Sequence, residues 1–173
     1  MSVRGRNYQY VGPVELAATV RAGSGGSPIS SAAEFAGWIA ERSAAELAEP
    51  FTFVVCTDGV LRLAPRRSEH VACAGGAMVL SAGEIGFVRE ADRWTVSEVS
   101  NQSTGYCPDG TSWSEVARAL DDVGLGRPSG FTHEVVFRRC PDCQEHNIVR
   151  EDDFACVFCG RDLPESWNVD PAA

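Results

Sequence analysis

Two cysteine pairs near the C-terminus constrain the fold of this chain more than any other feature of its sequence. Pro-Asp separates Cys140 from Cys143, Val-Phe separates Cys156 from Cys159, and twelve residues lie between the two pairs. Each C-x2-C pair can chelate one ion from a tight turn, and four thiolates favour zinc in a closed tetrahedral geometry. The spacing therefore predicts one structural zinc ion bound by these four cysteines.

The residues around the pairs predict a zinc ribbon over 131–165. We expect a strand near 134–137, and a ribbon hairpin in which 147–150 pairs with 154–156 across an acidic turn. Zinc binding can supply about 10–16 kcal/mol of folding free energy, which would order a segment with little core of its own. Two alternatives remain, namely an iron centre of rubredoxin type and four ordinary buried thiols.

The remainder of the chain predicts an α+β fold. Residues 1–130 are expected to form a mostly antiparallel sheet with two covering helices, on which the ribbon packs. A flexible segment at 22–28 and a loose tail at 166–173 complete the expected organisation.

Helix and hairpin signals place the elements of that domain. Serine and glutamate at capping-box spacing begin each predicted helix. The helices cover 32–48, with Ser31 and Glu34 as the capping pair, and 113–123, with Ser112 and Glu115. Alternating apolar residues predict two hairpins. Their strands are 51–56 with 60–63, across Asp58-Gly59, and 84–89 with 94–99.

The basic and acidic residues exclude several classes of function. All 15 basic residues are arginine, so Schiff-base catalysis and a Walker-type phosphate lysine are excluded. The formal net charge is −9, and residues 131–170 carry four arginines against nine acidic residues. A surface of this sign repels phosphate backbones, so we expect another protein, not nucleic acid, as the partner.

Cysteine usage and hydropathy predict a cytoplasmic protein. The seven cysteines accompany no export-type leader, which favours thiols and metal ligation over disulfides. No stretch is apolar enough to span a membrane, so no membrane association is expected. The free thiols Cys73 and Cys107 are interpreted as buried residues, not nucleophiles.

A polar segment around His70 to Pro108 could form a pocket for a small-molecule ligand. A histidine and a carboxylate can exchange protons, and paired arginines can bind an anionic group such as a nucleotide phosphate. The candidates are His70, Glu84 and Ser103 for catalysis and Arg66, Arg67, Asn101 and Tyr106 for ligand binding. The same residues also fit structural roles in turns and backbone hydrogen bonds.

The order of motifs in this segment resembles that of a poorly characterised domain. His70 is followed by Ala-Gly-Gly76, then Ala-Gly-Glu84, and after a hairpin by Ser103-Thr-Gly-Tyr-Cys-Pro108. The similar domain occurs in plant calmodulin-binding proteins with IQ motifs and in bacterial proteins, some of them toxin- or effector-like. The last motif of that domain reads Ser-Gly-His-Tyr-x-Pro. This chain has Ser-Thr-Gly-Tyr-Cys-Pro there, so the second histidine of the pattern is missing. The resemblance implies no settled reaction, and without an IQ motif it does not imply calmodulin binding.

Two hypotheses follow from the sequence. The first is a non-enzymatic zinc-binding accessory or protein-interaction protein, with a structural four-cysteine site. The second is a small enzyme or nucleotide-type ligand binder, related to a toxin or effector system, that uses His70, Glu84, Asn101 and Ser103.

Overall fold

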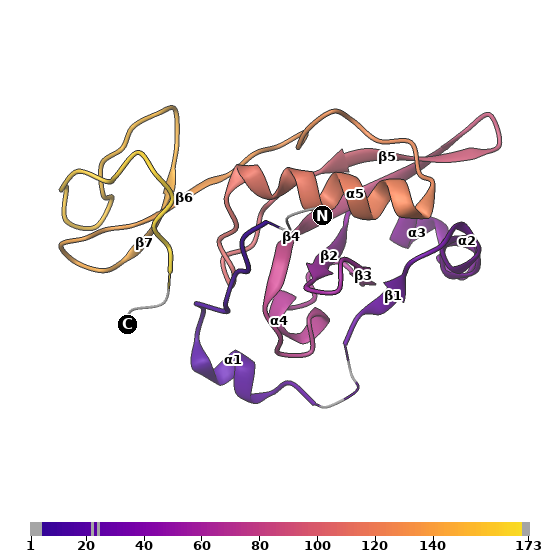
Figure 1. The fold of residues 1–173 in the computed structure, drawn as a ribbon, viewed down its shortest axis with the longest axis horizontal. Coiled ribbons are helices and arrows are strands. Elements are labelled where there is room, and N and C mark those ends of the chain that lie inside the picture. The colour runs from indigo at the N-terminus through magenta and orange to yellow at the C-terminus, as the bar shows by residue number, and fades with distance from the viewer. Residues whose placement is uncertain (1–4, 22, 24, 171–173) are drawn as a thin grey trace.

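The computed structural model of the chain describes residues 5–21, 23 and 25–170, and it confirms the α+β fold (Figure 1). A five-stranded antiparallel sheet has the order β1-β3-β2-β4-β5, and a separate two-stranded sheet pairs β6 with β7. The four cysteines lie in the C-terminal part that follows β6. In the part of the chain that is described, no helix has the length and apolar character needed to cross a membrane.

The elements are short apart from β4 and α5. The helices are α1 Val14–Ala18, α2 Ala32–Ala40, α3 Ala44–Leu47, α4 His70–Cys73 and α5 Trp113–Val123, with a 3-10 turn at Gly110–Ser112. The strands are β1 Ser27–Ile29, β2 Phe51–Cys56, β3 Leu61–Ala64, β4 Val79–Glu90, β5 Arg93–Val99, β6 Val136–Arg139 and β7 His146–Val149.

Both predicted hairpins are confirmed. Gly59 has φ of 81° in the β2–β3 turn, where the Asp58 carboxylate also accepts a 2.9 Å hydrogen bond from the Val60 amide. In the β4–β5 turn, Ala91 and Asp92 have φ of 47° and 66°, and two successive positive φ values match the right-handed twist of hairpin strands. Strand β4 begins five residues earlier than the predicted 84, at Val79.

Each face of the sheet has its own covering layer. Every residue of β2 is buried, and in a strand successive side chains point to opposite faces. On one face, Phe51 and Phe53 pack with residues of α2 and α5, as predicted for two covering helices. On the other face, Val54 packs with Val71 of α4 and with Tyr106. The central strand is therefore closed to solvent from both sides.

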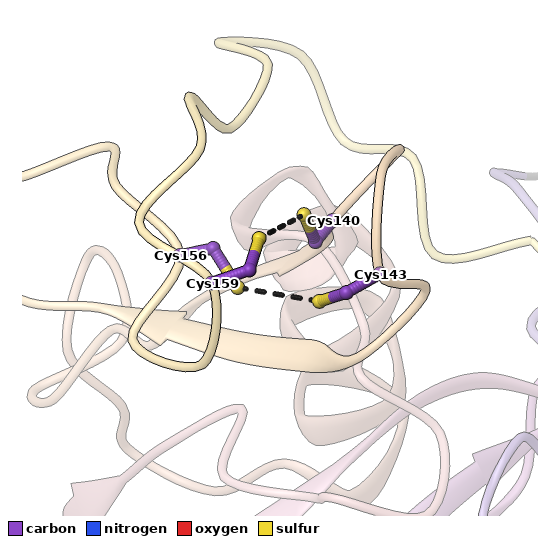
Figure 2. Close-up of side chains that lie close together, drawn as sticks. All are labelled: Cys140, Cys143, Cys156 and Cys159. Atoms are coloured by element: carbon purple, nitrogen blue, oxygen red, sulfur yellow. Dashed lines mark hydrogen bonds between the residues drawn. The ribbon is translucent and has the colours of Figure 1, made fainter.

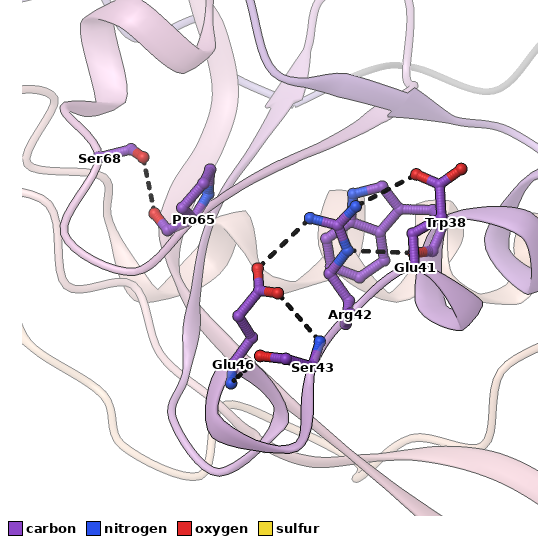
Figure 3. Close-up of polar contacts among 7 residues, drawn as sticks. All are labelled: Trp38, Glu41, Arg42, Ser43, Glu46, Pro65 and Ser68. Carbon is purple, nitrogen blue, oxygen red and sulfur yellow. Dashed lines mark hydrogen bonds and ion pairs between the residues drawn. The ribbon is translucent and has the colours of Figure 1, made fainter.

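The first predicted helix is interrupted near its middle. Helix α2 ends at Ala40 and α3 begins after Ser43, which forms a complete capping box with Glu46. Arg42 lies at this corner, where its Nε donates a 3.1 Å hydrogen bond to the Trp38 carbonyl and its guanidinium contacts Glu46 at 3.4 Å (Figure 3). The predicted helix over 32–48 is wrong as one element, because a local cap and a satisfied carbonyl favour the break.

The capping box predicted at Ser112 is also wrong. Ser112 has α-helical dihedral angles because a 3-10 turn leads into α5, so its side chain does not cap the helix. Its hydroxyl instead lies 2.8 Å from the hydroxyl of Ser81 on β4. The end of α5 is as predicted, with Gly124 at φ of 80°.

The flexible segment predicted at 22–28 needs correction at its end. Residues 22 and 24 lie outside the described part of the chain, and Ser27 and Pro28 belong to β1, which pairs with β3. Proline is tolerated there because β1 is an edge strand.

The loose tail predicted at 166–173 is wrong for the described residues 166–170. The Trp167 Nε1 donates a 2.7 Å hydrogen bond to the Cys107 carbonyl, and its ring meets Tyr8 edge to face with centroids 5.2 Å apart. Val169 is 1% exposed. Residues 171–173 lie outside the described part.

Candidate metal centre

The four cysteines predicted as ligands come together at one point. Their Sγ atoms all lie within 4.8 Å of one another, and Cys140–Cys159 and Cys143–Cys156 are both 3.6 Å apart (Figure 2). Zn–S bonds of about 2.3 Å in a tetrahedron would separate the sulfur atoms by about 3.8 Å. The sulfur cage therefore has the size of a tetrahedral metal site, and the four cysteines could hold a metal ion.

Hydrogen bonds to Cys156 support the charged form of a ligand. The Asn147 Nδ2 and the Phe158 amide each donate to the Cys156 sulfur over 3.4 Å. Burial works against the thiolate, but these bonds and an interaction with the Cys159 backbone lower the pKa of Cys156 to about 6. A thiolate is the form that binds metal, so the surroundings of this ligand favour metal binding.

Asn147 belongs to this site and was not predicted from the sequence. It is 2% exposed, and besides its bond to Cys156 its Oδ1 accepts a 2.9 Å hydrogen bond from the Val157 amide. One side chain thus fixes the turn that carries the second cysteine pair. The available signal was an asparagine inside a predicted strand, where asparagine is uncommon.

The hairpin predicted inside this module is wrong. Strand β7 pairs with β6, in the register Val136↔Val149 to Arg139↔His146, and not with 154–156. Ala155 forms only an isolated bridge with Asp162. The chain reverses between β6 and β7, which pair with each other, and the second cysteine pair approaches β7 through the bond from Asn147 to Cys156.

Side chains tie the module to the main domain. The amide of Asn101 donates to the carbonyls of Pro108 and Val135 at 2.9 and 2.8 Å, and its Oδ1 accepts from the Val135 amide at 2.6 Å. Arg138 is 7% exposed and its Nε donates a 3.0 Å hydrogen bond to the Pro164 carbonyl. Polar groups thus fix both the entry to β6 and the return of the chain after the second cysteine pair.

The predicted catalytic residues take different positions. His70 is half-buried and its Nε2 lies 2.9 Å from the Gly83 carbonyl, while burial lowers its pKa. Glu84 lines a polar cleft of about 480 Å³ whose walls also include Glu98 and His133. Ser103 is 1% exposed and accepts a hydrogen bond from the Tyr106 amide. Of the three, Glu84 is the one that lines this cleft.

The predicted ligand-binding residues are also separated. Asn101 is fully buried and bonded to backbone as described above, and the hydroxyl of Tyr106 donates a 2.7 Å hydrogen bond to the Ala77 carbonyl. Burial raises the pKa of the Tyr106 hydroxyl above its usual value. Arg66 forms a 3.5 Å ion pair with Glu49, and Arg67 is exposed with φ of 64°.

Cys73 and Cys107 are buried, as predicted. Burial raises the pKa of each thiol to about 12, which keeps both in the unreactive neutral form at ordinary pH. Neither belongs to the four-cysteine cage.

Comparison with known proteins gives no information on this site, so its chemistry is inferred from its geometry. No protein-family model, curated protein or solved structure matches the chain.

Proposed function

We propose that the four cysteines bind one structural zinc ion and that the protein is a zinc-stabilised accessory protein which contacts another protein. The observation that carries the proposal is the sulfur cage, in which four thiols lie within 4.8 Å of one another, enough ligands to complete a tetrahedral coordination shell. Such a shell leaves no position for water or substrate, which is typical of structural zinc.

The exposed residues of the module support the contact with a protein. Val157 and Phe158 lie between the last two ligands and are 76% and 62% exposed. Their backbone is fixed by Asn147 and by the Cys156 sulfur, so two large apolar side chains are held out into solvent. Exposed apolar residues in a rigid turn are a common feature of protein-interaction surfaces.

The enzymatic alternative draws less support from the geometry. Asn101, Ser103 and Tyr106 use their polar groups in bonds to the backbone, so their side chains are not available to a substrate. We therefore propose a binding role and not a catalytic one.

Metal removal tests the structural role of the ion. Chelation of the zinc-loaded protein is expected to increase hydrogen exchange in β6, β7 and the turns at 140–145 and 156–160, because the cluster beneath them contains few apolar side chains. Strands β2 and β4 belong to separate, larger clusters and should keep their protection. Unchanged exchange in the module after verified metal loss would refute a structural role.

A further inference from the structure

An apolar groove separates the cysteine module from the N-terminal arm. It has a volume of about 470 Å³ and lies between Val11–Pro13 and the loop at 104–107 on one side and Val157 and Phe158 on the other. Phe137 and Ile148, which are paired across β6 and β7, also line it. The volume is within the range of about 300–1,000 Å³ that is usual for ligand-binding pockets.

Strand alternation places a histidine and an arginine along this groove. His146, Ile148 and Arg150 are alternate residues at and just beyond β7, so they share one face, and all three line the groove. Asn147 and Val149 are buried, and Asn147, which also borders the groove, donates a hydrogen bond to the Cys156 sulfur. Strand β7 therefore borders both sites, with Asn147 at the metal centre and His146, Ile148 and Arg150 along the groove.

The charge of the groove is opposite to that of the whole chain. The formal net charge of the protein is −9, but among the described residues no aspartate or glutamate lines this groove. The guanidinium of Arg150 makes no ion pair or hydrogen bond with another residue of the described chain. An apolar ligand that carries a carboxylate complements both properties of this surface.

The apolar surface continues outside the groove. Five large apolar residues are exposed in the described chain, and three of them, Val14, Val157 and Phe158, lie in the groove or directly beside it. A small molecule enclosed in the groove would leave Val14 uncovered, whereas a peptide crossing it could bury the rim as well.

We infer that this groove binds a peptide segment of a partner protein that carries a large apolar side chain next to an aspartate or glutamate. The inference rests on the proposed function, and it specifies the partner's chemistry and the surface that recognises it. The apolar side chain packs on Phe137 and Ile148, and the carboxylate accepts hydrogen bonds from Arg150.

Selection from a peptide library displayed on phage, with the zinc-loaded full chain as the target, tests this inference. Enriched peptides are expected to combine a large apolar residue with an acidic one. A synthetic enriched peptide should bind about tenfold more tightly than its counterpart in which asparagine or glutamine replaces the acid, because a charged hydrogen bond is lost.

Variants of the protein assign the two parts of the recognition. Arg150→Ala should remove the preference for the acid, while Arg161→Ala, an exposed arginine of the same module outside the groove, should preserve it. Phe158→Ala should weaken both peptides about tenfold, while Val88→Ala, an exposed apolar residue on β4, should not. Phe158 contacts the Cys156 sulfur through its backbone amide and not through its side chain, so the zinc content of Phe158→Ala should equal that of wild type.

Several results would overturn the inference. They include a library without enriched peptides, enriched peptides without an acid, and an acid preference that survives Arg150→Ala. Binding of decanoate in place of any peptide would show a small-molecule pocket, and self-association abolished by Phe158→Ala would show that a second copy fills the groove. If zinc is retained in these experiments, only the groove inference fails, whereas a chain without metal refutes the proposed centre itself.

Discussion

Replacing Asn147 by alanine should weaken zinc binding while leaving all four ligands in place. The side chain donates to the Cys156 sulfur over 3.4 Å and accepts from the Val157 amide over 2.9 Å. A hydrogen bond to a charged group contributes about 1.5–3 kcal/mol, and loss of a group that orients a metal ligand typically costs about 10–100-fold in affinity. These two ranges agree, since about 1.4 kcal/mol corresponds to a factor of ten.

The assay is competition for zinc with a chromophoric chelator at fixed pH. Asn147→Ala should raise the zinc dissociation constant about 10–100-fold. Asn147→Asp should raise it further, because a carboxylate cannot donate to the sulfur and adds a negative charge beside four thiolates. Equal affinity in wild type and both variants would refute the assigned role of Asn147.

Asn101 offers a matched control, since it is another buried asparagine bonded to backbone. Its three hydrogen bonds go to Pro108 and Val135, not to sulfur. Asn101→Ala should lower the free energy of unfolding by about 2–4 kcal/mol and leave the zinc affinity of the folded protein within about threefold. A large loss of zinc affinity in this variant would show that docking of the module, and not local hydrogen bonding, controls the site.

Three further predictions concern the main domain. Burial lowers the pKa of His70 below the ordinary 6.5, so the unfolded state binds more protons than the folded state at acidic pH. The free energy of unfolding should therefore fall as the pH drops below about 6.5. In urea unfolding, His70→Gln should remove this part of the pH dependence. Gly83→Ala should prevent stable folding, measured by thermal denaturation, because a Cβ at that position would lie 1.9 Å from the Ser100 carbonyl oxygen; a melting temperature equal to wild type would contradict the close packing. Trp167→Ala should cost about 2–4 kcal/mol in chemical unfolding through loss of the Tyr8 contact and the bond to Cys107, whereas a loose tail would give no change.

The sequence predicted those parts of the fold that depend on local chemistry. The C-x2-C spacing identified all four residues of the sulfur cage, and Asp58-Gly59 identified a hairpin, because the dihedral angles of such turns restrict the residues that can form them. The α5 helix and its end at Gly124 follow from the same kind of short-range signal.

Several errors arose where distant residues determine the outcome. Strand β7 pairs with β6 and not with 154–156. The Ser112 hydroxyl contacts Ser81 and does not cap its helix, and Trp167 packs on Tyr8. Each of these contacts joins segments that local patterns treat separately. The role of Asn147 was missed for the same reason, since its partner Cys156 lies on another turn.

Native mass spectrometry with elemental analysis of the purified protein tests the central claim most directly. The account predicts one zinc per chain and a mass which shows that the four ligand cysteines have lost their thiol protons. Replacing any one of the four by serine should abolish zinc binding. A chain without metal, or one that holds iron in place of zinc, would contradict the account.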